Sequence, residues 1–217
     1  MNKKGKKFFN ILIMIVIIIA LCLIGFVSYY YISNYIMTKE AEDTVDIFEE
    51  QVSNIQEEVP VQEEQNTTQN ITQNPTTTNN RKPTIKYKNY TVIGTIQIPK
   101  TKVRVPIVDK VTTSSIASSA AVLYGPGLNK TGNTVIIAHN YRNGTFFSNN
   151  KKLVVGDKVY ITDLSGKKIE YSIYKTYITG ENDFSYATRD TNGKKEISLS
   201  TCTTDATKRL VIWAKET

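Results

Sequence analysis

Hydrophobic and polar positions divide the chain into three stretches with different patterns. Residues 8–32 form an apolar run without a single charged side chain. The next stretch, residues 33–64, places apolar residues three and four positions apart, at Val45, Phe48, Val52, Ile55 and Val59. That spacing is typical of one face of a helix. From about residue 86 onward, β-branched and polar residues alternate, which indicates strands. The pattern therefore predicts an apolar helix, an amphipathic helix and a β domain, in that order.

The β domain contains seven runs with strand character, separated by clusters of Gly, Asn, Asp and Ser. These runs are residues 90–99, 102–108, 133–140, 157–164, 168–180, 196–202 and 209–216. The segment "DLSGKK" (163–168) is a hairpin turn signal, and only "TTSSIASSAAVLYG" (112–125) favours a short helix. Seven or eight short strands in one domain predict an all-β fold, a seven- to eight-stranded barrel with one or two short helices.

Charge changes sign twice along the chain. Four lysines and no acid precede the apolar run, residues 33–80 carry a net charge of −9, and residues 81–217 carry +12. About 20 apolar residues suffice to cross the roughly 30 Å hydrocarbon core of a bilayer. Because lysines flank only its N-terminal side, the positive-inside rule keeps that side in the cytoplasm. We therefore predict a single-pass cell-membrane protein with a cytoplasmic N-terminus and an extracellular β domain.

Two alternatives to a retained anchor involve cleavage. A signal peptide has a shorter apolar region, roughly 7–15 residues, and ends at small residues that this run lacks. Cys22 could mark a lipoprotein, but Leu21 stands where a small residue is expected. Both observations favour a retained anchor.

Three segments follow from these patterns. Residues 1–32 form the cytoplasmic tail and transmembrane anchor, residues 33–84 an acidic stalk and linker, and residues 85–217 the β-barrel domain. Within the stalk, the apolar seam fits either a short coiled coil or a single amphipathic helix. Residues 65–84 are rich in Asn, Thr and Gln, a composition that cannot bury a core and predicts a tether.

The predicted exported part contains one cysteine, Cys202, so it cannot form an intramolecular disulfide. In an oxidising compartment an odd cysteine either pairs with another chain or is a reactive thiol. A buried, inert cysteine is the third possibility.

The single histidine, His139, and Cys202 each stand where an apolar strand runs into a polar loop, and Arg209 opens the last strand. A nucleophilic cysteine needs a neighbouring cation or base to favour its thiolate. Acyl transfer also needs a donor to the developing oxyanion, which an arginine fork can supply. Taken singly, each signal is weak, because a lone histidine is more often structural and an arginine that opens a strand is more often a solvated edge. Together the three residues are the minimum set for this chemistry.

These motifs resemble those of the sortases, the membrane-anchored cysteine transpeptidases of Gram-positive bacteria. "SLSTC" (198–202) followed by "RLVIWAK" (209–215) is similar to the sortase cysteine motif and the arginine-bearing strand after it. "NTVIIAHNYRNGTFF" (133–147) looks like the sortase histidine segment, and "IGTIQIPKTKVRVPIV" (93–108) like the opening strands. The resemblance covers about residues 90–217.

By this resemblance, Cys202 is the nucleophile, His139 the acid/base partner and Arg209 the group that holds the substrate or oxyanion. Arg209 is preferred to Lys208 because the arginine of the family directly precedes the apolar strand. Ser198 stands where the family has Thr, a mild departure. The resemblance implies cleavage of an LPXTG-like sorting signal after Thr through a thioacyl-enzyme, with transfer to an amine. The implied partners are surface proteins bearing a C-terminal sorting signal and, as acceptor, a peptidoglycan precursor or pilin amine.

Further expectations concern the loop at 181–195, subclass and cofactors. Hydrophobic residues of this loop are expected to line the sorting-signal groove.

The absence of a second apolar span and of an Asp-Pro-aromatic lid triplet favours a class A- or class D-like enzyme over a pilin-polymerising one. Some relatives bind calcium, and Glu181 and Asp183 are candidate ligands, but two acids do not make a site. We expect no metal and no cofactor.

Two other interpretations predict different properties. A non-catalytic surface module would hold Cys202 as a buried or intermolecular cysteine. Papain-like peptidases place Cys before His, whereas here His139 comes 63 residues before Cys202, and the Ser-His-Gly-Cys motif of the L,D-transpeptidases is missing. The basic charge suits an anionic cell wall or a solvated lysine-rich face equally well. The predicted location excludes a nucleic-acid partner.

Overall fold

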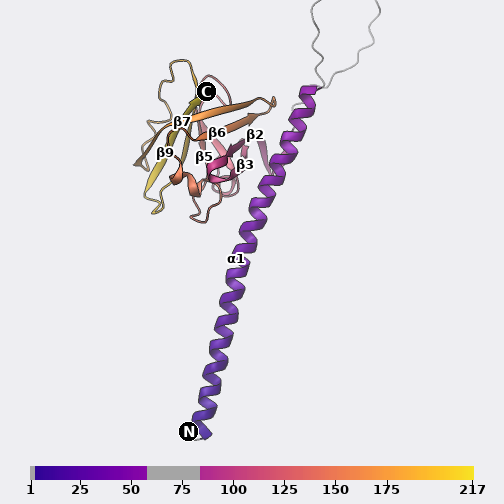
Figure 1. Ribbon diagram of the computed structural model, residues 1–217, viewed down its shortest axis with the longest axis vertical. Coiled ribbons are helices and arrows are strands. Elements are labelled where there is room, and N and C mark those ends of the chain that lie inside the picture. The colour runs from indigo at the N-terminus through magenta and orange to yellow at the C-terminus, as the bar shows by residue number, and fades with distance from the viewer. Residues whose placement is uncertain (1–2, 58–83) are drawn as a thin grey trace, which may run out of the picture. The chain divides into compact units, whose positions relative to one another are not determined.

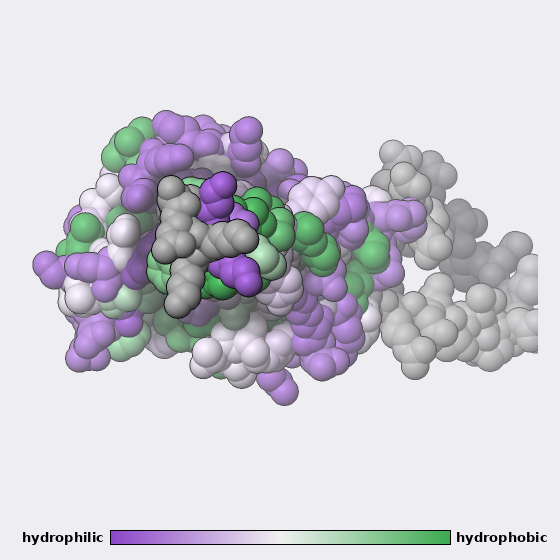
Figure 2. All heavy atoms as spheres, turned by 90° about the horizontal axis from the view of Figure 1, so that it is seen from below, coloured by the Kyte–Doolittle hydropathy of each residue, from purple (hydrophilic) through white to green (hydrophobic). Residues whose placement is uncertain are grey.

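The computed structural model describes residues 3–57 and 84–217. These residues divide into two compact units, and the boundary along the chain lies between Glu40 and Ala41. Helix α1 (Lys3–Glu57) begins in the first unit and is the one described helix that is long and apolar enough to cross a membrane. Apolar residues in the run 8–32 are exposed along the helix. Figure 2 shows this hydrophobic surface in green near the N-terminal end of the chain.

The strands of the second unit form one sheet that closes on itself (Figure 1). The strands are β1 (Lys86–Tyr87), β2 (Tyr90–Ile98), β3 (Val103–Val108), β4 (Ala120–Tyr124), β5 (Gly132–Ile137), β6 (Lys158–Asp163), β7 (Lys168–Gly180), β8 (Lys195–Cys202) and β9 (Lys208–Glu216). The short helices are η1 (Pro99–Thr101), α2 (Thr113–Ile116) and η2 (Phe147–Lys152).

The strand order is β1-β2-β3-β4-β5-β8-β9-β7-β6, and pairing of β2 with β6 closes an eight-stranded barrel with β1 outside the closure. The pairs β3–β4 and β5–β8 are parallel, and the other pairs are antiparallel. This mixed barrel confirms the predicted fold class. The predicted hairpin is also present, because β6 ends at Asp163 and β7 begins at Lys168.

The stretch 112–125 contains the predicted short helix in its first half only, and its second half is a strand. Helix α2 is four residues long and begins with a reciprocal pair of bonds between Thr112 and Ser115. The hydroxyl of Ser119 then donates to the Ser115 carbonyl (2.7 Å), a local bond that competes with further helix. Residues 120–124 form β4 instead, since they pair with β3 and β5 on either side.

The barrel interior is filled by β-branched and leucine side chains from successive strands. The fully buried members include Ile96, Ile98, Ile107, Ile136, Ile161, Ile197 and Leu199. Each fully buried side chain of this size contributes roughly 1.5–3 kcal/mol relative to exposure. This core fixes the register of the strands, because a one-residue slip would turn each apolar set outward.

The second unit also includes the end of α1. There the side chains of Ala41, Val45 and Phe48 are fully buried and Val52 is 3% exposed. Arg104 of β3 donates to Asp46 (2.5 Å) and to Glu49 (2.7 Å) beside this seam. The predicted apolar face is therefore real and packs within residues 41–217 rather than in a coiled coil.

Part of the predicted stalk and linker lies outside the described residues. This applies to the Ile55 side chain and Val59 of the seam, and to residues 58–83 as a whole.

Candidate active site

Strands β5, β8 and β9 lie side by side and bring the three predicted catalytic residues to one end of the barrel. The parallel register pairs Ile137 with Ser200, and the antiparallel register pairs Cys202 with Arg209. Directly paired residues point to the same face of a sheet, and side chains two positions further along point there again. Continuing the β5–β8 register by two residues therefore places His139 beside Cys202.

Two side-chain hydrogen bonds extend this register past the last paired residue. The buried hydroxyl of Thr201 donates to the carbonyl of Ala138 at 2.8 Å. The amide of Asn140 donates to the carbonyl of Cys202 at 2.9 Å. Together these bonds hold the residues on either side of His139 to the residues that form the end of β8.

A tight turn joins β8 to β9 and sets the spacing of Cys202 and Arg209. The backbone N–H of Thr203 donates to the Lys208 carbonyl (3.0 Å), and that of Ala206 to the Thr203 carbonyl (2.9 Å). Asp205 accepts from the hydroxyl of Thr203 (2.5 Å). Hydrogen bonds from Thr203 and then Thr207 lower the pKa of Asp205 to about 2. The carboxylate thus stays ionised and holds the turn.

The three candidate side chains are half-buried and almost free of partners. Cys202 is a free cysteine, and no hydrogen bond joins its thiol to any residue that the structure describes. The same is true of the His139 imidazole. Arg209 donates to the neighbouring Lys208 carbonyl at 3.2 Å and has no carboxylate partner within residues 3–57 and 84–217. A thiol, an imidazole and a guanidinium with unused donors and acceptors thus meet at one edge.

Two residues that the sequence analysis did not single out surround His139. Besides Asn140, the ring of Tyr141 lies 5.1 Å from the imidazole, centroid to centroid, at an angle of 44°. The only signal for either residue was its place beside His139 in the histidine segment. The hydrogen bond of Asn140 and the ring contact of Tyr141 depend on how the strands and loops pack, and local sequence patterns do not contain that information.

The loop between β7 and β8 covers the rest of this outer face. Tyr186 and Ala187 pack on Val135 of β5 and Val211 of β9, and the Tyr186 hydroxyl lies 3.3 Å from that of Ser200. Further apolar contacts come from Ile137, Tyr177 and Trp213. Phe184 at the loop tip is 55% exposed.

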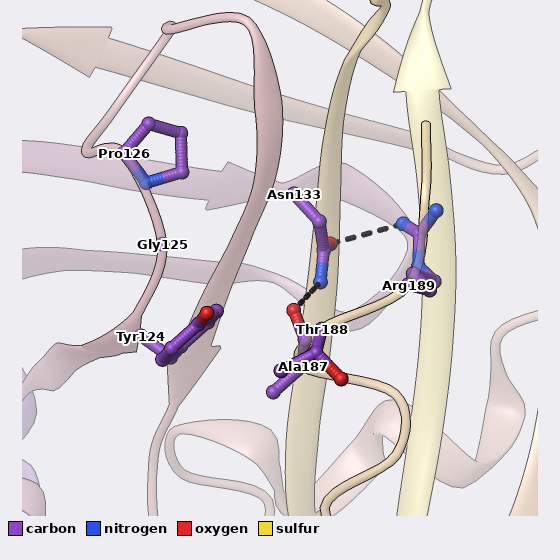
Figure 3. A pocket seen from close by; sticks show the side chains of 7 residues that line it. All are labelled: Tyr124, Gly125, Pro126, Asn133, Ala187, Thr188 and Arg189. Carbon is purple, nitrogen blue, oxygen red and sulfur yellow. Dashed lines mark hydrogen bonds between the residues drawn. The ribbon is translucent and has the colours of Figure 1, made fainter. Parts of the chain in front are cut away.

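A pocket of about 430 Å³ lies at the far end of the same loop (Figure 3). Tyr124, Gly125 and Pro126 form one wall, and Asn133, Ala187, Thr188 and Arg189 the other. His139 follows the end of β5 and is six residues from Asn133, about 20 Å at 3.3 Å per residue if the chain stays extended. The pocket is therefore separate from the cysteine edge.

The two candidate calcium ligands differ in their surroundings. Asp183 accepts hydrogen bonds from the hydroxyl of Thr179 and the backbone N–H of Ser185 (2.9 Å), and these bonds lower its pKa. The Glu181 carboxylate makes no hydrogen bond to the residues that the structure describes. Within the part of the chain that the structure describes, no group of three or more His, Cys, Asp or Glu side chains lies together.

Comparison with protein families gives a match to the sortase domain over residues 96–217, more than half of the chain. The chain therefore belongs to the sortase family, whose members are cysteine transpeptidases. This confirms the resemblance seen in the cysteine and histidine segments. No curated protein matches the chain.

Solved sortase structures share the fold. The lid mutant of sortase A from Corynebacterium diphtheriae is 26% identical with a TM-score of 0.53, over 58% of this chain and 70% of that one. The pilus-related sortase C of Group B Streptococcus is 30% identical with a TM-score of 0.54, over 58% and 67%. Sortase C from Clostridium perfringens SM101, at 23% identity, a TM-score of 0.51 and coverage of 58% and 70%, supports the fold alone. Because sortases A and C match to a similar degree, the comparisons show the family and not the subclass.

Proposed function

We propose that this transpeptidase cleaves an LPXTG-like sorting signal after Thr and transfers the protein to a cell-wall or pilin amine. The observation that carries the proposal is the placement of Cys202, His139 and Arg209 on three neighbouring strands of a sortase barrel. All three side chains are half-exposed and have few bonds of their own.

In the first step the Cys202 thiolate attacks the threonine carbonyl carbon. The carbonyl oxygen takes up the electron pair, and the Arg209 fork, which uses only one donor on the neighbouring Lys208 carbonyl, stabilises that charge. When the carbonyl re-forms, the peptide C–N bond breaks and His139 donates a proton to the leaving amine. The products are a thioacyl-enzyme and a free downstream peptide.

In the second step an acceptor amine attacks the thioester carbon. His139, now neutral, accepts the proton that the amine loses. Collapse of the second oxyanion breaks the C–S bond and returns Cys202 as a thiolate. The new amide joins the surface protein to the acceptor, so bonds and protons balance over the two steps.

The same proposal assigns the segments. Residues 1–32 anchor the enzyme with a cytoplasmic N-terminus, residues 33–84 form the stalk and linker, and residues 85–217 act outside the cell as the catalytic domain. The apolar surface of α1 and the four preceding lysines support this orientation.

Exposed apolar side chains of the loop at 181–195 line the sorting-signal groove in this proposal. Phe184 is the strongest candidate, because it is exposed and its ring lies 6.2 Å from the ring of Tyr186, which is buried on the face that leads to Cys202.

The proposal is tested with the full chain in detergent micelles and a set of fluorogenic LPXTG-type peptides. We expect cleavage after Thr that depends on Cys202, and a hydroxamate product when hydroxylamine replaces the natural amine. The Cys202→Ala variant should show neither product. No cleavage of any peptide, together with a Cys202 thiol that resists iodoacetamide in the folded protein, would leave a non-catalytic surface module instead.

A further inference from the structure

The general base of a nucleophilic site is usually oriented by a third group, most often a carboxylate. His139 has no such partner among the residues that the structure describes, because no hydrogen bond joins its ring to any of them and its ring contact is with Tyr141. Only its backbone is bonded. Its N–H donates to the Ile116 carbonyl (3.3 Å), and its carbonyl accepts from the Phe147 N–H (3.2 Å).

The ring of Tyr141 is the side-chain group that contacts the imidazole among the described residues. The two ring centroids are 5.1 Å apart with an interplanar angle of 44°, within the 4.5–7 Å range of favourable aromatic pairs. Such pairs contribute about 0.5–1.5 kcal/mol beyond the area they bury. That is enough to favour one orientation of a half-buried ring.

Tyr141 is itself held in place at both ends. Its backbone N–H donates to the buried hydroxyl of Ser148 at 2.9 Å, and its own hydroxyl donates to the Ala117 carbonyl at 2.7 Å. Partial burial raises the pKa of Tyr141, so the phenol remains a donor at neutral pH. Its ring also lies 6.0 Å from that of Phe146, centroid to centroid.

One short segment therefore supports both rings. Adjacent carbonyls at the end of α2, those of Ile116 and Ala117, accept from the His139 backbone and from the Tyr141 hydroxyl. We propose that Tyr141 is a positioning residue that holds the His139 imidazole toward Cys202, in place of a carboxylate. This proposal rests on the function proposed for Cys202 and His139.

The test compares wild type, Tyr141→Phe and Tyr141→Leu as full chains in micelles. Tyr124→Leu, which changes a half-exposed tyrosine in the separate pocket, is the matched control. His139 is the only histidine of the chain, so labelling histidine with 13C at Cε1 gives one NMR signal. Its order parameter reports how firmly the imidazole is held.

We expect Tyr141→Leu to lower kcat by roughly 10- to 100-fold with little change in KM, because a misplaced catalytic group can cost about 100-fold. The His139 order parameter should fall in the same variant. Tyr141→Phe keeps the ring contact and should restore most of kcat and of the order parameter. Tyr124→Leu should match wild type in both.

Other outcomes overturn the proposal. A Tyr141→Leu variant that keeps the wild-type order parameter would show that the ring does not hold His139. The same conclusion would follow if kcat of Tyr141→Leu fell only in proportion to the fraction of folded protein, as measured by a melting curve. Should wild type cleave no peptide, the proposed function fails, while the order parameters still decide the contact.

Discussion

The polar side chains at the two ends of the outer face of β5, β8 and β9 differ in how many hydrogen bonds they make. At the end farthest from the cysteine, the Asn133 amide uses all four of its bonding positions. It donates to the carbonyls of Tyr186 and Ala187 and accepts from Ser198 and Arg189. At the cysteine end, His139, Cys202 and Arg209 have almost no bonds to the residues that the structure describes. We call the first the saturated end, after the Asn133 amide, and the second the open end. Even at the saturated end, Arg189 Nε and Trp213 Nε1 are buried without a hydrogen-bond partner among the described residues.

The saturated end also contains an ion pair. Arg189 bonds Glu196, with side chains 10% and 9% exposed, and the Tyr174 hydroxyl donates to the same carboxylate at 2.6 Å. Polar groups buried together must satisfy one another, whereas groups meant for a substrate must stay available. The difference teaches that this face is built for rigidity at one end and for chemistry at the other.

The largest effect is expected at the open end. Cys202→Ala should lower kcat by at least about 1,000-fold, because no other thiol can form the acyl-enzyme there. Peptide cleavage measures the loss of activity, and the melting temperature measures any loss of stability. Ser200→Ala, one row away on the same strand, is the control and should keep its activity. A large loss in both variants would mean that the face depends on packing rather than on the thiol.

The guanidinium at the open end is the next target. Arg209→Lys keeps the charge but loses the planar fork, and removal of an oxyanion donor costs about 100- to 1,000-fold in kcat. The adjacent, exposed Lys208→Met should have little effect on steady-state kinetics. Equal losses in the two variants would point to the general charge of the turn instead of to Arg209.

At the saturated end the expected effect is on stability. Glu196→Gln leaves the Arg189 charge buried without a counter-ion, and breaking a buried pair in this way costs about 3–5 kcal/mol. The single tryptophan, Trp213, lies 4.5 Å from the Arg189 guanidinium and reports unfolding by fluorescence.

Glu216→Gln is the matched control for this charge removal. It removes a more exposed pair with Lys195 (2.8 Å), and such pairs contribute about 0–1 kcal/mol. If the two variants unfold alike, the saturated end is not a stabilising network.

The smallest effect concerns the turn that spaces Cys202 from Arg209. Because the folded pKa of Asp205, about 2, lies below the unfolded value of about 3.9, its contribution is complete above the unfolded value. It is lost as the pH falls toward 2. Asp205→Asn should therefore melt slightly earlier than wild type at pH 7, and the gap should shrink steadily as the pH falls from about 4 to about 2. A gap that stays constant over that range would come from geometry, not from charge.

Most of the strands could be predicted because alternating β-branched residues mark them locally. Strand β4 could not, since its alanines favour helix on their own and become a strand only through their neighbours β3 and β5. The helix face at Val45, Phe48 and Val52 was visible as a seam. What covers it depends on packing within residues 41–217, which spacing alone does not contain.

The candidate site was predictable where a residue type and a strand end coincide, as for His139, Cys202 and Arg209. Their meeting on one face follows from the β5–β8 register, which local sequence does not encode. The same limit applies to Tyr141 and Asn140. Their contacts with His139 and Cys202 exist only once the strands have paired.

The unequal sequence distances across the site have a consequence for how the enzyme folds. Cys202 and Arg209 meet across a turn of six residues, whereas the parallel β5–β8 pairing must close a loop of about sixty. Local contacts form quickly, and distant ones pay the entropy of loop closure first. We expect the thiol and guanidinium to come together early and the imidazole to arrive late. The folding domain would thus hold its nucleophile before it holds its base, and it would remain inert until β8 has paired with β5.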